Sequence, residues 1–395
     1  MNAQIQPRYH AAVIGAGLVG AAAALALARH GLNVALIEAH EFPLPAEAWD
    51  ARVYAISPGS EALLNDLGAW THLDARRIQS VFRMDVRGDA GGQLRLDAYE
   101  SGAPKLATIL ESGRLQQALW QRVKVQDNIE VFCPTGVEDI LWGAAHSVIT
   151  LNNGQKIEAE LVIGADGAQS KTRERAGIVA KVSPYGQSGV VANFLTEKPH
   201  GGTAFQWFRS DHAKGDIVAY LPLPGNRMSL VWSTVSEHAQ SLLALEPDAF
   251  CSRVETAGDA QLGKLELLTK PAAFPLRLMQ PSSVVAPGCV LVGDAAHGVH
   301  PLAGQGVNLG FGDVAALAEV LSQRGRALCG DAQLLAHYAR CRAEPVARLQ
   351  FVTDSLWRLF GMENPPASQV RNTGMSALNT LGPVKSALVH EALFS

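Results

Sequence analysis

Three side chains suited to ligand binding or proton transfer stand close together in VLVGDAAHGVHPLAGQGVNLG, which runs from residue 290 to 310. Asp294 follows an apolar run that predicts a buried strand, and His297 and His300 come shortly after it. A carboxylate at the carboxyl end of such a strand lies where open α/β sheets bind ligands, and it can accept hydrogen bonds from sugar-alcohol hydroxyls such as the ribityl chain of a flavin. Apart from this aspartate, no further residue with metal-site spacing accompanies the two histidines. We therefore predict no metal site here.

The residues that follow predict a helix start facing an anion or a carbonyl. Gly304, Gln305 and Gly306 lead into a helix that is expected to begin near Asn308. Free N–H groups at a helix start stabilise negative charge, as a reduced flavin requires. Two further glycines, at 310 and 312, lie inside this helix and each cost about 1 kcal/mol relative to alanine. We expect a flat ring or a neighbouring strand beside them.

A second motif, near the N-terminus, is typical of dinucleotide binding. A strand, a helix and a second strand are predicted in succession over residues 10–37, and GAGLVG stands between the first two. Gly15 permits the tight turn, Gly17 lets the backbone approach a pyrophosphate, and Gly20 allows close packing of helix and sheet. Glu38, after the second strand, can bind ribose hydroxyls. This pattern does not separate FAD from NAD.

A third turn occurs in KIEAELVIGADGAQSKTR, at 156–173. A buried strand is predicted to end at Asp166-Gly167, and Ser170 and Arg173 follow at regular spacing. The alternative interpretation is a simple Asp-Gly turn without a ligand.

Length and composition limit the number of domains, the binding partners and the location of the protein. A chain of 395 residues predicts two domains, and a net charge of −4 without a dense basic cluster argues against nucleic-acid binding. The five cysteines are scattered, which predicts a reducing, cytoplasmic location without disulfides. The uncharged run over 11–28 reaches the length of a membrane span, but its glycines and the strand after it favour a soluble strand–turn–helix unit.

The three motifs, in this order, resemble those of the FAD-dependent aromatic hydroxylases, which are group A flavoprotein monooxygenases with the p-hydroxybenzoate hydroxylase-like fold. Within that family the chain is most similar to the ubiquinone-biosynthesis hydroxylases of polyprenylated phenols. DARVYAIS, at 50–57, resembles the D-x-R-x-x-A-L segment of that branch, and Arg114-Leu115-Gln116 resembles its second flavin-contacting region. The likeness covers nearly the whole chain. One departure is Gly215-Asp216, where the branch usually has Gly-Pro.

This resemblance implies an α/β fold: a Rossmann-like FAD-binding domain with an inserted, mainly β substrate domain and C-terminal helices. The expected boundaries are 1–80, 98–180 and 272–330 for the FAD-binding domain, 81–97 and 181–271 for the substrate domain, and 331–395 for the helical region. Its last stretch, after Pro365-Pro366, could dock on the body, form a homo-oligomer contact or touch the inner membrane surface.

The resemblance also implies roles for individual residues. Glu38 would hold the adenosine ribose, Arg52 and Arg114 the phosphate–ribityl side of FAD, and Asp294 its ribityl chain. Asp166 belongs to the motif that serves both FAD and the reductant. The cofactor-binding set is completed by Gly15, Gly17, Gly20, Gly304, Gln305, Gly306 and Asn308.

For catalysis, the resemblance implies that Pro301 lies beside the flavin ring and that Arg52 also faces the reductant. His297 is a candidate proton relay, and Trp207 and Tyr220 are candidate substrate-pocket residues, with a packed-core role as their alternative. The implied reaction is the hydroxylation of a polyprenylated phenol by O2 and NAD(P)H through a C4a-hydroperoxyflavin.

Other functions remain open at this point. The chain could act on a small soluble aromatic, reduce isoprenoid chains, or serve as a flavin-binding scaffold subunit of a biosynthetic complex. A halogenase is disfavoured because the W-x-W-x-I-P motif is absent from the sequence.

Overall fold

The computed structural model describes residues 8–42, 47–209, 215–300, 302, 304–362, 364–382, 384–386 and 389. Within them, the first sheet has eight strands, with the order β18-β19-β11-β1-β2-β8 and with β10 and β9 continuing from β11. Strands β19, β11, β1, β2 and β8 run parallel to their neighbours in this order. The strands are β1 (Arg8–Ile14), β2 (Val34–Ile37), β8 (Ile129–Phe132), β9 (Val137–Leu141), β10 (Ser147–Leu151), β11 (Lys156–Gly164), β18 (Val285–Ala286) and β19 (Cys289–Leu291).

Helices cover one face of this sheet and build the main core. The side chains of α1 are almost all apolar and buried, because the helix lies between the sheet and its neighbours α3 and α7. On the opposite face, β9 and β10 contribute side chains to a second apolar cluster. The helices of this part are α1 (Leu18–Arg29), α2 (Pro58–Asp66), α3 (Ser112–Lys124), α4 (Lys171–Arg175) and α7 (Gly306–Ser322), with the short 3-10 turns η1 (Trp70–His72), η2 (Ala75–Arg77) and η3 (Gly293–Ala295).

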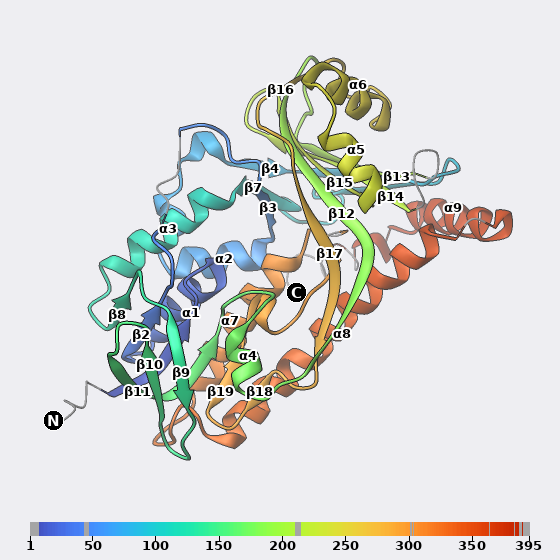
Figure 1. Ribbon diagram of the computed structural model, residues 1–395. Helices are drawn as coiled ribbons and strands as arrows, with labels where there is room; N and C mark the ends of the chain where they lie inside the picture. The colour runs from blue at the N-terminus through green and yellow to red at the C-terminus, as the bar shows by residue number, and fades with distance from the viewer. Residues whose placement is uncertain are drawn as a thin grey trace.

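The second sheet is mainly antiparallel and lies at the top of Figure 1. Its order is β16-β12-β15-β14-β13-β5-β6, and β17 pairs with the long strand β12. Helices α5 (Ser236–Leu243) and α6 (Pro247–Ala257) cover one face. The strands are β5 (Arg83–Arg87), β6 (Gln93–Asp97), β12 (Ala180–Thr196), β13 (Thr203–Arg209), β14 (Asp216–Leu223), β15 (Arg227–Val235), β16 (Leu265–Leu267) and β17 (Ala272–Pro281).

A small sheet joins the two larger ones. It has the order β3-β7-β4, with β3 (Val53–Ile56), β4 (Gln79–Val81) and β7 (Ala107–Glu111). Val53 and Ala55 pack in one apolar cluster with Leu221 and Leu223 of β14. The face of the second sheet that is not covered by α5 and α6 therefore looks toward β3.

Two long helices complete the chain. Helix α8 (Ala332–Phe360) lies against α7, and α9 (Pro365–Thr380) packs against β6 (Figure 1). Asn372 Oδ1 accepts hydrogen bonds from Ala90 N and Gly92 N, so α9 holds the hairpin between β5 and β6. Among the described residues, none of the helices is long and apolar enough to cross a bilayer.

The elements expected from the sequence are present at the three motif turns. The two strands and the helix expected within 10–37 are β1, α1 and β2, and the helix expected near Asn308 begins at Gly306. The α/β class is confirmed. The domain boundaries remain a prediction; β17, which falls within the range assigned to the FAD-binding domain, pairs with β12 in the second sheet.

Candidate functional site

The three motif turns meet at the carboxyl ends of the parallel strands. Gly15 has a φ of +96°, and a Cβ added there would lie 2.5 Å from the carbonyl oxygen of Ala165. At Gly20 an added Cβ would lie 1.9 Å from the carbonyl oxygen of Gly15. These glycines therefore permit a contact that no larger residue allows. In contrast, a Cβ at Gly17 would meet nothing within 4 Å, so this part of the turn faces open space.

Glu38 lies beside the first turn and is already hydrogen-bonded to it. Its Oε2 accepts from Ala16 N at 2.8 Å, and its Oε1 accepts from His40 N at 3.0 Å. On the other side of the turn, Gln116 of α3 donates Nε2 to Ala16 O at 2.6 Å. Gln116 belongs to a segment that resembles a family pattern, but its contact with a residue 100 positions away cannot be predicted from spacing.

Arg52 and Asp294 both lie near Tyr54, a residue that could not be singled out from the sequence. The guanidinium of Arg52 lies 5.4 Å from the centre of the Tyr54 ring. Burial raises the pKa of the Tyr54 phenol; the charge of Arg52 lowers it and that of Asp294 raises it further. Both charged side chains are exposed. The arrangement thus brings one cation and one carboxylate to the same open region.

A buried carboxylate, Glu111, organises the neighbouring arginines. Arg77 donates Nη2 and Nε to the two Glu111 oxygens, each at 2.7 Å, and Arg114 donates Nε at 3.1 Å. The same carboxylate accepts from Asp50 N at 2.7 Å. Asp50 in turn accepts from Arg52 N and from Gly113 N. Glu111 therefore ties the loop that carries Arg52 to the start of α3, where Arg114 lies.

The side chain of Asp166 is hydrogen-bonded to the start of α4, whose N-cap is Ser170. One carboxylate oxygen accepts from Ser170 Oγ, and the other accepts from both Thr172 N and Thr172 Oγ1 at 3.0 Å. Arg173, one turn further on, donates to Ala295 O at 3.0 Å and so joins the second motif turn to the third. The role of Asp166 in binding FAD or the reductant stays a prediction.

The start of α7 is joined to the end of β3 through Asn308. Its Nδ2 donates to Ala55 O and to Gln305 Oε1, both at 2.8 Å, and its Oδ1 accepts from Ser57 N at 3.0 Å. Gly304 has a φ of +62° and lies close to Ala55. The start of α7, the third motif turn and β3 therefore form one unit.

The two histidines of the third motif are both buried, and each has its own partner. His297 Nε2 lies 2.6 Å from Asp313 Oδ2, and His300 Nε2 lies 3.3 Å from Gln187 Oε1. Among the described residues no group of three or more His, Cys, Asp or Glu side chains gathers as a metal site. Proton relay by His297 stays a prediction. Pro301 lies outside the described residues.

The expectation for the two glycines inside α7 was wrong. A Cβ at Gly310 would lie 2.6 Å from Val19 on α1, and one at Gly312 would lie 2.9 Å from the Arg342 guanidinium. Neither a flat ring nor a strand explains them. Close packing of α7 against α1 and against an arginine of α8 does.

Trp207 and Tyr220 point away from the motif turns. Both side chains lie in the cluster that α5 and α6 cover, and the Tyr220 hydroxyl donates to Val254 O of α6. Because side chains alternate along a strand, the residues on either side of them face the other way. The packed-core alternative holds for Tyr220, and its assignment to the substrate pocket is not supported by its position.

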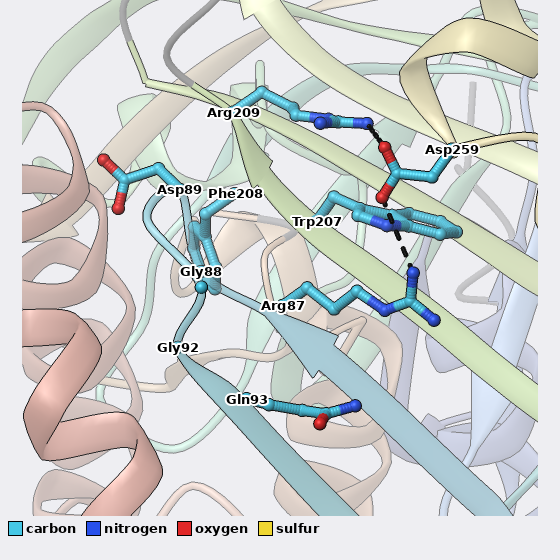
Figure 2. A pocket seen from close by; sticks show the side chains of 10 residues that line it. Arg87, Gly88, Asp89, Gly92, Gln93, Trp207, Phe208, Arg209 and Asp259 are labelled. Atoms are coloured by element: carbon cyan, nitrogen blue, oxygen red, sulfur yellow. Dashed lines mark hydrogen bonds and ion pairs between the residues drawn. The ribbon is translucent and has the colours of Figure 1, made fainter.

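Trp207 also borders a hollow of about 510 Å3 at the edge of the second sheet. Figure 2 shows Asp259 bridging Arg209 and Arg87 beside the indole ring. These charges pair with one another, and a second hollow of about 560 Å3 lies next to it, under α9. Neither hollow is lined by a residue of the three motifs.

The face that looks toward β3 carries two polar residues that sequence analysis missed. Asn193 on β12 pairs with Ser229 on β15, and Ser229 pairs with Leu221 on β14. Asn193 Nδ2 donates to Asp50 O at 2.8 Å. Asn193 Oδ1 and Ser229 Oγ are buried and have no hydrogen-bond partner among the described residues. A lone polar residue within the apolar stretch VVANFL was the available signal.

The departure from the family pattern at Asp216 lies on the covered face. Its carboxylate accepts from Trp232 Nε1 at 3.0 Å and from Thr234 Oγ1 at 2.6 Å, and His238 Nδ1 lies 3.6 Å away. This buried cluster joins the second sheet to α5, on the side of the sheet that faces away from β3.

The residues around the three motif turns have the charge and the exposure that FAD requires. The turn at Gly17 is open to a phosphate, Asp294 is exposed at a strand end, and no hydrogen bond from another described residue reaches the Asp294 carboxylate. Arg52 provides positive charge nearby. An anion at a helix start and a hydroxyl chain at a carboxylate are the contacts that this donor set suits, so the residues fit the group.

Comparison with known proteins agrees with this site. The family described as FAD binding domain matches residues 8–351. The chain is 34% identical to ubiquinone hydroxylase UbiL of Rhodospirillum rubrum, over 96% of this chain and 88% of that protein. It is also 34% identical to 3-demethoxyubiquinol 3-hydroxylase of Escherichia coli, over 97% of both chains.

Solved structures show the same fold. The p-nitrophenol 4-monooxygenase PnpA of Pseudomonas putida superposes with a TM-score of 0.78 at 17% identity, over 98% of both chains. HpxO of Klebsiella pneumoniae, solved with FAD and uric acid, gives a TM-score of 0.73 at 18% identity, over 99% of both chains. Sequence and fold together show that the chain belongs to the FAD-dependent aromatic hydroxylases, in the branch of the ubiquinone-biosynthesis hydroxylases.

Proposed function

We propose that the chain hydroxylates the ring of a polyprenylated phenol in ubiquinone biosynthesis, with FAD as cofactor and NAD(P)H and O2 as co-substrates. The observation that carries this proposal is the likeness to two ubiquinone-pathway hydroxylases over nearly the full length of the chain. The open turn at Gly17 and the exposed carboxylate of Asp294 support the cofactor.

The cofactor would be held by the groups that gather around the three turns. The N–H groups at the start of α1 and the side chain of Arg52 would bind phosphate, Glu38 the adenosine ribose, and Asp294 the ribityl chain. Arg114 would contribute to the phosphate–ribityl side from the start of α3. The start of α7, after Gly304, would place N–H groups near the negative charge of the reduced cofactor.

The bound flavin would supply the activation of O2, which amino-acid side chains cannot provide. The protein would orient the phenol ring and keep water out, and the apolar cluster of Val53, Ala55, Leu221 and Leu223 is suited to both tasks. In place of Trp207 and Tyr220, we propose that Asn193 and Ser229 bind an oxygen substituent of the ring, since their free polar atoms are buried on this face.

We also propose that the protein acts in the cytoplasm, at the surface of the inner membrane, where a prenylated substrate would reside. Exposed apolar residues on the C-terminal helices, such as Phe351 and Val370, support this location. Flotation with phospholipid vesicles tests it: the protein is expected to rise with the vesicles, and Phe351→Ser/Val370→Ser to float less.

The reaction is tested with purified protein that shows a flavin absorbance spectrum. NAD(P)H oxidation is measured with a prenylated phenol and with p-hydroxybenzoate, and products are identified by mass spectrometry. We expect the prenylated phenol to accelerate oxidation and gain one oxygen atom. Hydroxylation of p-hydroxybenzoate alone would favour a small soluble aromatic as substrate, and no response to either compound would favour a scaffold subunit.

A further inference from the structure

One acidic residue of α7 is the centre of a buried hydrogen-bond cluster directly behind the third motif turn. Asp313 Oδ2 accepts from Gly293 N at 2.8 Å and lies 2.6 Å from His297 Nε2. Asp313 Oδ1 accepts from Arg342 Nε at 2.7 Å. Asp313, His297 and Arg342 are all at least nine-tenths buried.

The charge of Asp313 is retained despite its burial. Burial works to raise the pKa of the Asp313 carboxyl, but His297 and Arg342 outweigh that effect and hold the pKa below its usual value. Arg342 also donates Nη2 to Leu309 O at 3.0 Å, and its guanidinium lies against Gly312. A charged group in this environment is stable only while its partners remain in place.

The turn that Asp313 contacts has little structure of its own. Residues 293–295 form a 3-10 turn, which is closed by hydrogen bonds from Ala296 N and His297 N to Gly293 O. Gly293 has a φ of +60°. Asp294, in the middle of this turn, is exposed, and its charge acts on the Tyr54 phenol of the same site. So short a turn depends on contacts from outside it to keep one orientation.

Helix α8 reaches the same strand end at a second point. Tyr338 donates its hydroxyl to Leu291 O, the last residue of β19, at 3.0 Å. Tyr338 and Arg342 are four residues apart and therefore share one face of α8. Helix α8 thus contacts the end of β19 directly through Tyr338. It contacts the turn that follows only indirectly, through Asp313.

We propose that Asp313 is a positioning residue for the flavin site: together with His297 and Arg342 it holds the 293–297 turn so that the Asp294 carboxylate faces the ribityl chain. Arg342 lies outside the three motifs, and this role gives α8 a direct influence on cofactor affinity. The inference rests on the FAD-binding part of the proposed function and is independent of the substrate.

The test measures FAD affinity by titrating the FAD-free protein with FAD and following the quenching of flavin fluorescence. We expect Asp313→Asn and Arg342→Met each to raise the FAD Kd about tenfold or more, which corresponds to about 1.4 kcal/mol. His297→Ala is expected to do the same. His297→Gln, which keeps an N–H donor of similar reach, is expected to restore most of the affinity.

Two further variants separate positioning from general stability. Arg348→Met changes an exposed arginine of α8 and is expected to leave the Kd unchanged. Asp313→Asn/Arg342→Met removes both buried charges together, so it is expected to fold where a single variant does not. The double variant keeps an acceptor for Gly293 N but lacks the tie to α8, and its Kd is also expected to be raised.

Unchanged FAD affinity in folded variants at Asp313 and Arg342, with only a lower unfolding temperature, would show that the cluster is purely structural and would overturn the inference. A failure of the proposed function appears differently, because the wild-type protein would then bind no FAD or hydroxylate no phenol. If the wild type binds FAD and the variants bind it equally well, only the positioning role is wrong.

Discussion

Asn193 on β12 and Ser229 on β15 lie directly opposite each other, on the face of the second sheet that looks toward β3. Each carries a buried polar atom without a hydrogen-bond partner among the described residues. A buried polar group without a partner destabilises a fold by about 1–3 kcal/mol. These two atoms are the basis of our proposal that an oxygen of the substrate binds at this place.

Replacing Ser229 by alanine is expected to separate stability from substrate binding. The Ser229→Ala protein should unfold no more easily than the wild type, because the lost hydroxyl makes no hydrogen bond within the described residues. The KM for the phenol should rise about fivefold, as expected for the loss of a hydrogen bond worth about 1 kcal/mol. Urea denaturation and steady-state kinetics give the two values. An unchanged KM would remove Ser229 from the substrate site.

Tyr220→Phe should have the opposite pattern. The Tyr220 hydroxyl donates to Val254 O inside the cluster under α6, so its removal should lower the free energy of unfolding by about 1 kcal/mol. The KM for the phenol should stay the same, since the residue faces away from β3. A raised KM with unchanged stability would reinstate Tyr220 as a pocket residue.

The glycines of the first turn offer a matched pair of variants. Gly17→Ala should fold, since an added Cβ meets nothing within 4 Å and the φ of −62° suits alanine. The substitution should lower the free energy of unfolding by less than about 1 kcal/mol. It should weaken FAD binding at least tenfold, because the added methyl group would occupy the place of the pyrophosphate.

Gly20→Ala is the contrasting variant in this turn. Its Cβ would lie 1.9 Å from Gly15 O, so the protein should lose stability as well as FAD. Thermal unfolding and FAD titration distinguish the two variants. Wild-type FAD affinity in Gly17→Ala would mean that the pyrophosphate does not lie on this turn.

Acid is expected to destabilise the protein partly through His300. Burial lowers the pKa of this side chain to about 4, although the nearby charge of Asp354 works in the opposite direction. The unfolded chain, with a histidine pKa of about 6.5, takes up the proton first as the pH falls. The contribution of His300 to the free energy of unfolding is therefore fully present above about pH 6.5. It is lost as the pH falls from about 6.5 to 4, by up to about 3 kcal/mol.

The measurement for His300 is the free energy of unfolding as a function of pH. His300→Gln should lose less stability between pH 6.5 and 4 than the wild type. His72→Gln, at an exposed position, serves as the control and should follow the wild-type curve. A His300→Gln curve parallel to that of the wild type would contradict the assignment.

The sequence predicted the parts of the site whose physics is local. A buried strand, a glycine turn and an apolar helix follow one another within about 25 residues, so β1, α1 and β2 could be placed from spacing alone. The same holds for Asp294, which follows an apolar strand and is exposed.

The remaining features depend on contacts between distant segments. Alternation along β13 and β14 identifies two faces, but only the packing of α5 and α6 decides which face is covered, so the sequence alone left open whether Trp207 and Tyr220 line a pocket or pack in the core. The contact of Asn193 with Asp50 joins residues 143 positions apart. Spacing alone predicts a flat ring or a strand beside Gly310, whereas the side chain of Val19 on α1 lies there.

Helix α9 also has a consequence for how the protein behaves outside its reaction. Strand β6 forms one edge of the second sheet, and Asn379 Oδ1 of α9 accepts from Arg95 N there, while Asn372 secures the adjoining hairpin. An uncovered strand edge readily pairs with another copy of the same chain. A chain that ends before Pro365 is therefore expected to self-associate during expression. By covering the edge of β6, α9 is expected to keep the protein soluble.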